Sequence, residues 1–260
     1  MQTLIRIIHD YGISFNELIL GDRHLRYPLY LLYHGYLLPA QQKHLNINRS
    51  IFDTKDFFCN YIYGVNREFR HKAFEVFNTY KKVMSPGTGN NNMPEHPLVL
   101  TQPEKIAFQK KCKFSIAFDS VRMPGFVTEK ILHAFAAKTI PIYFGDPHID
   151  EQFNKKSFID VADYDFDLER VLEKIIEIDQ NDDLYLDMLQ QPAFVHEDFI
   201  DLKRKEFENF IYNIFDQDNK DAFRRSTIAA PKAHEERLKE YNRLSKSRVY
   251  GLLKRFFDYI

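Results

Sequence analysis

KFSIAFDSVRMPGFVTEKILHAFAAKTIPIYFGD, residues 113–146, predicts a strand, a turn, a helix and a second strand in succession. Residues 113–118 alternate apolar and polar side chains and lead to Asp119. Thr128 stands at a helix N-cap position, and apolar residues recur after it at helical spacing. Residues 139–144 form a short apolar run with β-branched residues, typical of a strand buried on both faces of a parallel sheet. The segment predicts a βαβ unit that binds its ligand at the carboxyl ends of the strands.

The turn before this helix favours an anion. A helix N-terminus presents N–H donors and a partial positive charge, and the ammonium of Lys130 adds a full charge, so a diphosphate would fit at residues 128–130. Glu129 would accept hydrogen bonds from sugar or ribose hydroxyls beside it. Asp146 ends the second strand, where its carboxylate would touch a sugar or a base. The alternatives are an ordinary charged first turn at residues 128–130 and an ordinary G-D-P turn at Asp146.

The same region resembles the donor-binding motif of the α-1,3/4-fucosyltransferases, glycosyltransferase family 10. In that family an F-E-N-S element precedes G-Y/F-x-T-E-K, P-V/I-Y-W/F-G-D/S-P and F-N-x-K-S-F. Residues 118–161, FDSVRMPGFVTEKILHAFAAKTIPIYFGDPHIDEQFNKKSFIDV, match all four elements in order and spacing. Weaker resemblance extends the match from Asp22 to about Pro192 through GDRHLRYPLYLLYHG (Gly21–Gly35), FFCNYIYGVNREFRHKAFEVFNTYKKV (Phe57–Val83), SPGTGNNNM (Ser85–Met93) and DLYLDMLQQP (Asp183–Pro192).

The resemblance implies roles for individual residues. Glu129 and Lys130 match the family pair that contacts the ribose and the diphosphate of GDP-fucose. Thr88 stands where the family usually has Arg or Lys, so it offers the phosphates a hydrogen bond without a charge.

The remaining donor-site candidates are Thr128 and the residues that surround it in the matched elements. Asp119 and Ser120 occupy positions where Glu-Asn is common, and Phe126 follows Gly125 where Tyr is common. One amide and one phenol of the family pattern are therefore replaced.

The resemblance also implies an α/β fold of the GT-B type, in which two Rossmann-like domains face each other. We expect residues 1–52 to be a remnant of the acceptor domain, residues 53–195 to form a complete donor-binding domain, and residues 196–260 to form a helical tail. The family's general base is a Glu upstream of the D-R-x-L-R-x-P-L-Y element. Residues 1–20 contain no matching context, and Glu17 is not expected to replace it, so no catalytic residue is assigned.

The amino-acid composition narrows the functional classes to which the protein can belong. The chain is 44% hydrophobic and 15% aromatic, which allows a sizeable core, and its net charge of −1 argues against a general nucleic-acid binder. Cys59 and Cys112 each lie in an apolar run, which indicates buried thiols in a reducing compartment. Neither a membrane span nor a signal-peptide pattern is visible, so we expect a cytoplasmic location.

The end of the chain differs in character. Residues 237–260 contain seven basic and two acidic residues, a net charge of +5, and on a helix their apolar residues would share one face. Such a segment suits an anionic membrane surface carrying a glycolipid acceptor, which would make the protein peripheral. The alternative is a helix that packs on the domain with a solvated basic face.

The resemblance implies an inverting transfer of L-fucose from GDP-fucose to a GlcNAc or glucose hydroxyl of an oligosaccharide or glycolipid, with an α-1,3 linkage. No cofactor and no metal are expected, because no cluster of metal ligands is recognisable in the sequence. Two alternatives stay open: a GDP-sugar-binding remnant with little activity, and a glycosyltransferase that uses another nucleotide sugar. Because the acceptor domain is expected to be partial, slow transfer by the chain alone is also expected.

Overall fold

The computed structural model describes residues 10–222 apart from 19, 66 and 96–100, together with residues 233, 236, 237, 239, 240 and 243. The predicted basic amphipathic segment, residues 237–260, therefore lies almost entirely outside the described residues. None of the described helices is long and apolar enough to cross a membrane.

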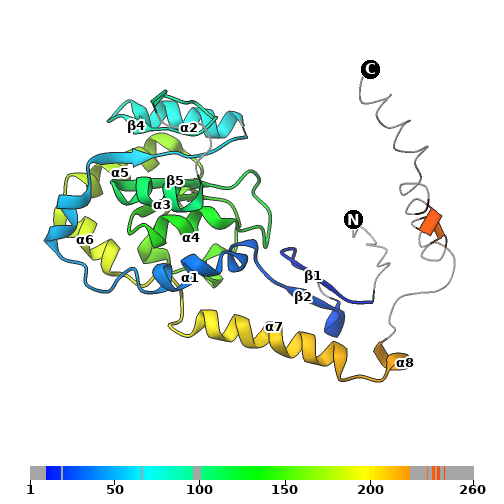
Figure 1. The fold of residues 1–260 in the computed structure, drawn as a ribbon. Coiled ribbons are helices and arrows are strands. Elements are labelled where there is room, and N and C mark those ends of the chain that lie inside the picture. The colour runs from blue at the N-terminus through cyan, green and yellow to red at the C-terminus, as the bar shows by residue number, and fades with distance from the viewer. Residues whose placement is uncertain are drawn as a thin grey trace, which may run out of the picture. The chain divides into compact units, whose positions relative to one another are not determined.

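A parallel sheet of five strands forms the centre of the fold (Figure 1). Its strands are β3 (Phe57–Asn60), β4 (Val83–Met84), β5 (Cys112–Phe118), β6 (Ile140–Phe144) and β7 (Ile159–Asp160), in the order β4-β3-β5-β6-β7. In the register of the central pair, Phe114 lies opposite Ile140 and Phe118 opposite Phe144. The strands predicted over residues 113–118 and 139–144 are thus confirmed within one residue at their N-terminal ends.

The helices of the described residues are α1 (His34–Gln41), α2 (Glu68–Asn78), α3 (Gln102–Lys110), α4 (Glu129–Ala136), α5 (Leu168–Asp179), α6 (Asp182–Gln190), α7 (Phe199–Phe215) and α8 (Asn219–Ala222). Of these, α2, α3 and α4 connect successive strands of the parallel sheet, α1 precedes it, and α5 to α8 follow β7. Short 3-10 turns cover Gly21–Arg23, Leu29–Leu32, Arg49–Thr54, Ile149–Glu151, Lys155–Ser157 and Val161–Tyr164, and a two-stranded sheet joins β1 (Gly12–Ser14) to β2 (His24–Arg26).

Side-chain hydrogen bonds cap the starts of α3 and α5. A capping box opens α3, where the Thr101 amide donates to Glu104 Oε2 over 2.8 Å. The Asp167 carboxylate accepts from the amides of Glu169 and Arg170 and so caps α5. The amphipathic helix α5 begins directly after this cap.

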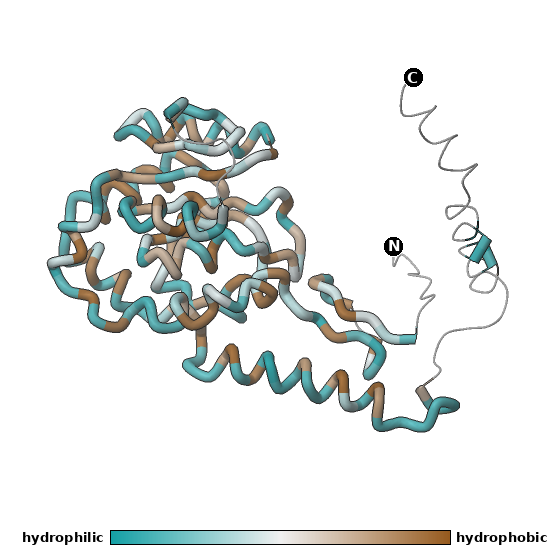
Figure 2. The backbone as a smooth tube through the Cα atoms, in the orientation of Figure 1, coloured by the Kyte–Doolittle hydropathy of each residue, from teal (hydrophilic) through white to brown (hydrophobic). Residues whose placement is uncertain are grey.

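The sheet is covered on both faces, because alternate side chains of its central strands enter different cores. Ile116 and Phe118 of β5 lie in a core shared with α2, α5 and α6, while Ala117 packs with α1 and α4 on the opposite face. Cys59 and Cys112 are free, buried thiols, as the sequence predicts. In α7, hydrophobic and hydrophilic residues recur in turn along the helix (Figure 2).

The chain divides into two compact units. One contains residues 14–18 and 26–206, including the whole parallel sheet. The other contains the described residues among 1–13, 19–25 and 207–260, where the Gln217 amide donates to the Tyr11 hydroxyl over 3.0 Å. The domain boundaries expected at 52/53 and 195/196 stay a prediction.

Candidate functional site

Asp119 follows β5 directly and lies buried at the carboxyl end of the sheet. Its backbone N–H donates to the carbonyl of Phe144, at the end of β6, over 2.7 Å. Its carboxylate accepts from the Thr128 hydroxyl, from the Thr128 amide at 3.4 Å and from the Tyr143 phenol at 3.2 Å. This one carboxylate therefore joins the start of α4 to strand β6.

Thr128 occupies the N-cap of α4, as predicted, but its side chain does not cap the helix. The hydroxyl donates to the Asp119 carboxylate instead. A buried carboxylate needs hydrogen-bond donors, because leaving a buried charge unsatisfied is costly.

Burial raises the pKa of Asp119 from its ordinary value of 3.8 to about 6, and the Lys130 ammonium, with its Nζ 3.9 Å from Asp119 Oδ1, opposes that rise. The carboxyl group therefore titrates in the weakly acidic range.

We predict that Asp119 makes the protein less stable as the pH rises from about 4 to about 6. Between these values the unfolded chain has released the proton and the native protein still holds it, so the free energy of unfolding falls with pH. Across this range the parent should lose about 2–3 kcal/mol relative to Asp119→Asn, which carries no titrating group there. Urea unfolding of both proteins measures this difference. A difference that does not change with pH would contradict the assignment.

The first turn of α4 carries charge in both signs. Lys130 Nζ lies 3.1 Å from the Thr128 hydroxyl oxygen and 3.5 Å from Glu129 Oε1. Lys105 of α3 places a second ammonium 3.7 Å from Glu129 Oε1. Burial by itself would raise the pKa of Glu129, but the two ammonium groups outweigh it and hold that pKa below its ordinary value. Glu129 is therefore an anion held between two lysines.

Lys105 itself is almost completely buried. Burial lowers its pKa to about 8, and the charge of Glu129 acts in the opposite direction. Glu129 and Lys105 thus stabilise each other's charged forms, which leaves Lys130 as the more exposed cation of the cluster.

The turn before α4 packs against residues 14–18 and Arg26. Gly125 has a φ of +83°, and a Cβ at this residue would lie 2.3 Å from the Phe15 carbonyl oxygen and 3.3 Å from Glu17 Cγ. The Phe126 ring meets the Phe15 ring edge to face, with centroids 5.1 Å apart. The turn is therefore fixed by close backbone packing that only glycine permits.

Asp146 lies at the end of β6 with its side chain fully buried. Its carboxylate pairs with Arg26 at 3.2 Å and accepts from the His148 amide at 3.0 Å. Its own backbone N–H donates to the Tyr143 phenol over 2.8 Å. Tyr143 thus contacts Asp119 with one side of its hydroxyl and the Asp146 backbone with the other.

One group of side chains in the described part of the chain has the composition of a metal site: Glu17, Asp146 and His148 offer ligand atoms within 4.8 Å of one another. Arg26 contacts both carboxylates, at 3.8 Å for Glu17 and 3.2 Å for Asp146. The guanidinium already supplies the positive charge that these carboxylates require, so we assign no metal there.

Comparison with known proteins shows the family to which the chain belongs. Residues 57–208 match the family model described as glycosyltransferase family 10 (fucosyltransferase), C-terminal part. The chain belongs to this family. It is 29% identical to the alpha-(1,3)-fucosyltransferase FucT of Helicobacter pylori, in a match that covers 71% of this chain and 44% of that protein. It is 28% identical to the putative fucosyltransferase R654 of Acanthamoeba polyphaga mimivirus, covering 78% and 35%. The chain spans less than half the length of these family 10 relatives.

Solved structures of the family share the fold. A crystal structure of an alpha1,3-fucosyltransferase with GDP-fucose superposes with a TM-score of 0.60 at 25% identity, over 78% of this chain and 70% of that one. The α/β fold of the GT-B type predicted from the sequence is confirmed.

Most of the predicted donor-site residues of this family 10 chain lie together. Contacts join Asp119, Thr128, Glu129 and Lys130 directly, and half-buried Ser120 follows Asp119 in the chain. Gly125, Phe126 and Asp146 connect to this group through the turn and through Tyr143.

Thr88 stands apart from this group. It is exposed, and its hydroxyl donates to the Gly64 carbonyl oxygen at 3.3 Å. Among the described residues no contact links Thr88 to Asp119 or Lys130. Its assignment to the donor site stays a prediction.

Sequence reasoning missed three residues of the site. Tyr143 lies in an apolar run, which predicts a core strand residue and gives no indication of a polar role. Its phenol nevertheless lies at the strand end, where ligands bind. Arg26 lies in the GDRHLR element, whose basic residues were a usable signal. Lys105 had no recognisable signal, because its partner is 24 residues further along the chain.

His133, in α4, is a packed residue. Its ring is fully buried between Tyr33 and Tyr36, with centroid distances of 5.3 Å and 4.8 Å. Burial lowers its pKa to about 3, so the ring is neutral at physiological pH.

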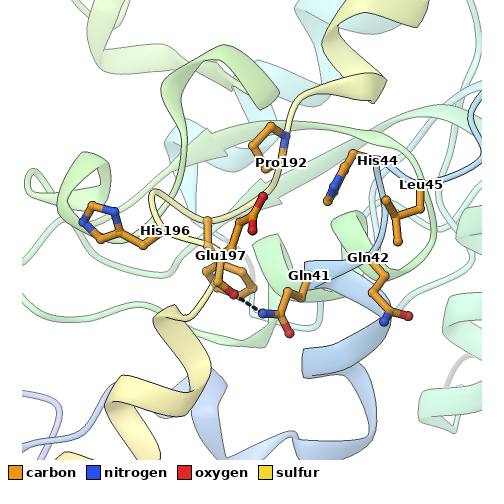
Figure 3. Close-up of a pocket in the computed structure, with 8 residues that line it drawn as sticks. Gln41, Gln42, His44, Leu45, Pro192, His196 and Glu197 are labelled. Carbon is orange, nitrogen blue, oxygen red and sulfur yellow. Dashed lines mark hydrogen bonds between the residues drawn. The ribbon is translucent and has the colours of Figure 1, made fainter.

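A separate hollow of about 330 Å³ opens between α1 and the segment that precedes α7 (Figure 3). Its lining is both polar and apolar, and the Gln41 side chain donates to the Glu197 carbonyl across it. The lining residues are Gln41, Gln42, His44, Leu45, Pro192, Phe194, His196 and Glu197. None of the predicted donor-site residues lines it.

Proposed function

We propose that the chain transfers L-fucose from GDP-fucose to a hydroxyl of a GlcNAc or glucose unit in a surface glycan, with an α-1,3 linkage and inversion at the anomeric carbon. The observation that carries the proposal is the start of α4, where Lys130 lies beside the anionic Glu129 and the buried Asp119. A helix N-terminus with an added ammonium suits a diphosphate. The family relationship supports fucose as the sugar.

In this reaction the bond between the sugar C1 and the diphosphate oxygen breaks, and negative charge develops on the departing GDP. Lys130 and the N–H groups of α4 would stabilise that charge. Glu129, held by Lys105, would accept a hydrogen bond from a ribose or sugar hydroxyl. The buried Asp119 would hold Thr128 so that α4 keeps its position during the reaction.

The direct test combines binding and product formation. Calorimetry with GDP-fucose, GDP-mannose and GDP measures donor preference, and chromatography with labelled GDP-fucose and N-acetyllactosamine or lactose detects fucosylated product. Preferential binding of GDP-fucose with product formation supports the proposal. Binding of another nucleotide sugar in its place would contradict it.

A second candidate is a glycosyltransferase with a different nucleotide sugar. It is favoured by Thr88, an exposed and uncharged residue at a position where the family usually has Arg or Lys. The same calorimetry distinguishes the two candidates, because the donor with the highest affinity identifies the substrate.

Glu129→Gln should lower kcat/KM for GDP-fucose by about 10- to 100-fold, the usual effect of losing one charge-assisted hydrogen bond. Gln keeps the shape of Glu but not its charge, so the buried Lys105 loses its partner and the thermal unfolding midpoint should fall as well. Glu173→Gln, an exposed residue of α5, is the matched control and should leave both quantities unchanged. If Glu129→Gln kept the parental kcat/KM, the assignment of Glu129 to the donor site would be wrong.

A further inference from the structure

Three lysines occupy the same position relative to the strands of the parallel sheet. Lys55, Lys110 and Lys138 each lie two residues before a strand, namely β3, β5 and β6. The sheet pairs β3 with β5 and β5 with β6, and parallel neighbours begin at the same edge. The three lysines therefore meet at the amino end of the strands, at the edge opposite the donor turn.

These lysines line a pocket of about 490 Å³. The apolar side chains of Leu45, Ile51 and Ala137 form part of its wall, and no carboxylate is among the described residues that line it. The whole lining belongs to the unit that contains the sheet. A pocket of this size holds a small organic molecule.

The ammonium groups of the pocket have free hydrogen-bond donors. Lys55 Nζ donates to the backbone carbonyls of Lys110 at 2.9 Å and Lys138 at 2.8 Å, and Lys138 Nζ donates to the Leu45 carbonyl at 3.2 Å. An ammonium has three donors, so Lys55 keeps one and Lys138 keeps two. The Lys110 side chain is exposed and bonds no other described residue.

The pocket lysines also lack carboxylate partners among the described residues. Lys113, by comparison, forms an ion pair with Asp179 at 2.6 Å. Asp56, which follows Lys55 in the chain, pairs with Lys111 at 3.9 Å instead. The positive charge of the pocket is therefore not neutralised by an acidic side chain.

Helix ends supply only part of the missing negative charge. The helices α1, α3 and α4 all end at this pocket, and each helix C-terminus is equivalent to about half a negative charge. Three such ends offset about half of the charge of three ammonium groups. Burial lowers the pKa of Lys55 to about 8, and the charges of Lys138 and Lys110 act in the same direction. The three groups therefore repel one another, and an anion would relieve that repulsion.

Lys138 occupies a position that favours glycine. Its φ is +52°, and its backbone N–H donates to the Phe135 carbonyl at 2.9 Å where α4 ends. Glycine would adopt this conformation without a steric cost. The lysine therefore adds a charge to the pocket at the expense of a less favourable backbone.

We propose that this pocket binds a phosphate monoester carried on a small, largely apolar body. The ammonium groups of Lys55, Lys110 and Lys138 would bind the phosphate oxygens, and the apolar wall would contact the body. A free organic phosphate and a phospholipid headgroup both present this chemistry. The proposal does not depend on fucosyl transfer, because the pocket and the donor turn lie at opposite edges of the sheet.

Calorimetric titration of the full chain with hexyl phosphate, inorganic phosphate and hexanol tests the site. Hexyl phosphate should bind about 10-fold or more tightly than inorganic phosphate, because its chain covers the apolar wall. Hexanol should not bind detectably, since it lacks the charge. Increasing salt should weaken the binding of both phosphates.

The matched variants keep Lys55, which bonds two backbone carbonyls. Lys110→Gln combined with Lys138→Gln should weaken the binding of hexyl phosphate by about 10- to 100-fold. Lys72→Gln combined with Lys82→Gln removes the same charge from two other exposed lysines and should leave this affinity unchanged. Lys130→Ala should also leave it unchanged, since Lys130 lies at the start of α4.

Co-sedimentation with vesicles of phosphatidylcholine, with and without phosphatidic acid, distinguishes the two sources of phosphate. Binding to phosphatidic acid that the Lys110 and Lys138 double variant loses identifies a lipid headgroup. Vesicle binding that is absent, or equal in parent and double variant, identifies a free organic phosphate, provided that the double variant has lost affinity for hexyl phosphate. Both results support the pocket.

Three results would overturn the proposal. One is a parent chain that does not bind hexyl phosphate, and another is equal affinity in the parent and the Lys110 and Lys138 double variant. The third is affinity lost in Lys130→Ala and kept in the double variant, which would locate the phosphate at the start of α4. Titration with GDP-fucose tests the proposed function separately, and the double variant should bind this donor as the parent does.

Discussion

Lys130→Ala is expected to weaken the binding of GDP by about 10- to 100-fold, which corresponds to the ~1.5–3 kcal/mol of a charge-assisted hydrogen bond. Lys130 Nζ lies 3.9 Å from Asp119 Oδ1 and 3.5 Å from Glu129 Oε1. The diphosphate brings negative charge to a place that already holds two carboxylates. Without the ammonium, these groups would repel the ligand, so the loss includes repulsion as well as a missing bond.

The loss of GDP affinity is expected for a substitution of Lys130 and not for a substitution of Lys105. Because Lys105 lies 3.7 Å from Glu129, it can keep that carboxylate paired while Lys130 turns toward a phosphate. Lys105→Met should therefore reduce stability by leaving Glu129 with one partner fewer, whereas Lys130→Ala should reduce affinity.

Calorimetric titration of GDP measures the effect of Lys130→Ala, and increasing salt should reduce the difference between parent and variant. Lys174→Ala is the matched control, because Lys174 also lies on a helix beside a glutamate, Glu177, at 2.8 Å, but on α5. If the Lys130 variant bound GDP as tightly as the Lys174 variant, the phosphate site would not be at the start of α4.

Gly125→Ala is expected to lower the free energy of unfolding by about 2–5 kcal/mol and turnover by about 100-fold or more. The φ of +83° is unfavourable for a residue with a Cβ, and that Cβ would lie 2.3 Å from the Phe15 carbonyl oxygen. Either the turn or residues 14–18 must move. In both cases the spacing between the donor turn and Glu17 changes, so turnover should fall even where the fold survives.

Gly35→Ala provides the control for this prediction. Gly35 lies in α1 without a positive φ, and a Cβ there would meet no atom within 4 Å. Alanine in a helix should stabilise the protein by about 0.5–1 kcal/mol, without changing turnover. Chemical denaturation and the product assay, applied to Gly125→Ala and Gly35→Ala, test these two expectations. Parental stability and turnover in Gly125→Ala would show that the turn tolerates displacement.

The α/β class and the central βαβ unit were predictable because both depend on local patterns. The alternation before Asp119, the helical spacing after Thr128 and the apolar run of residues 139–144 each reflect the environment of one element. Glu129 and Lys130 were predictable for the same reason, since a helix start and its charges are adjacent in the chain.

The side-chain partners were not predictable in this way. Thr128 was correctly placed at the N-cap, yet its hydroxyl bonds Asp119, which comes from the preceding strand. Tyr143 has the sequence pattern of a core strand residue, and only the pairing of β5 with β6 brings its phenol to that carboxylate. Burial of Asp119 then makes each of these donors necessary, because a buried charge must be satisfied.

The sequence by itself therefore determined the fold class, the family and the helix start that carries Glu129 and Lys130. Only the tertiary structure decided that Lys105 shares Glu129, that Arg26 neutralises Asp146, and that Glu17 holds His148 across 131 residues. The physical reason is the range of the interactions. Periodicity and capping act within a few residues, whereas ion pairs and hydrogen bonds between distant side chains exist only after the strands have paired in one order and register.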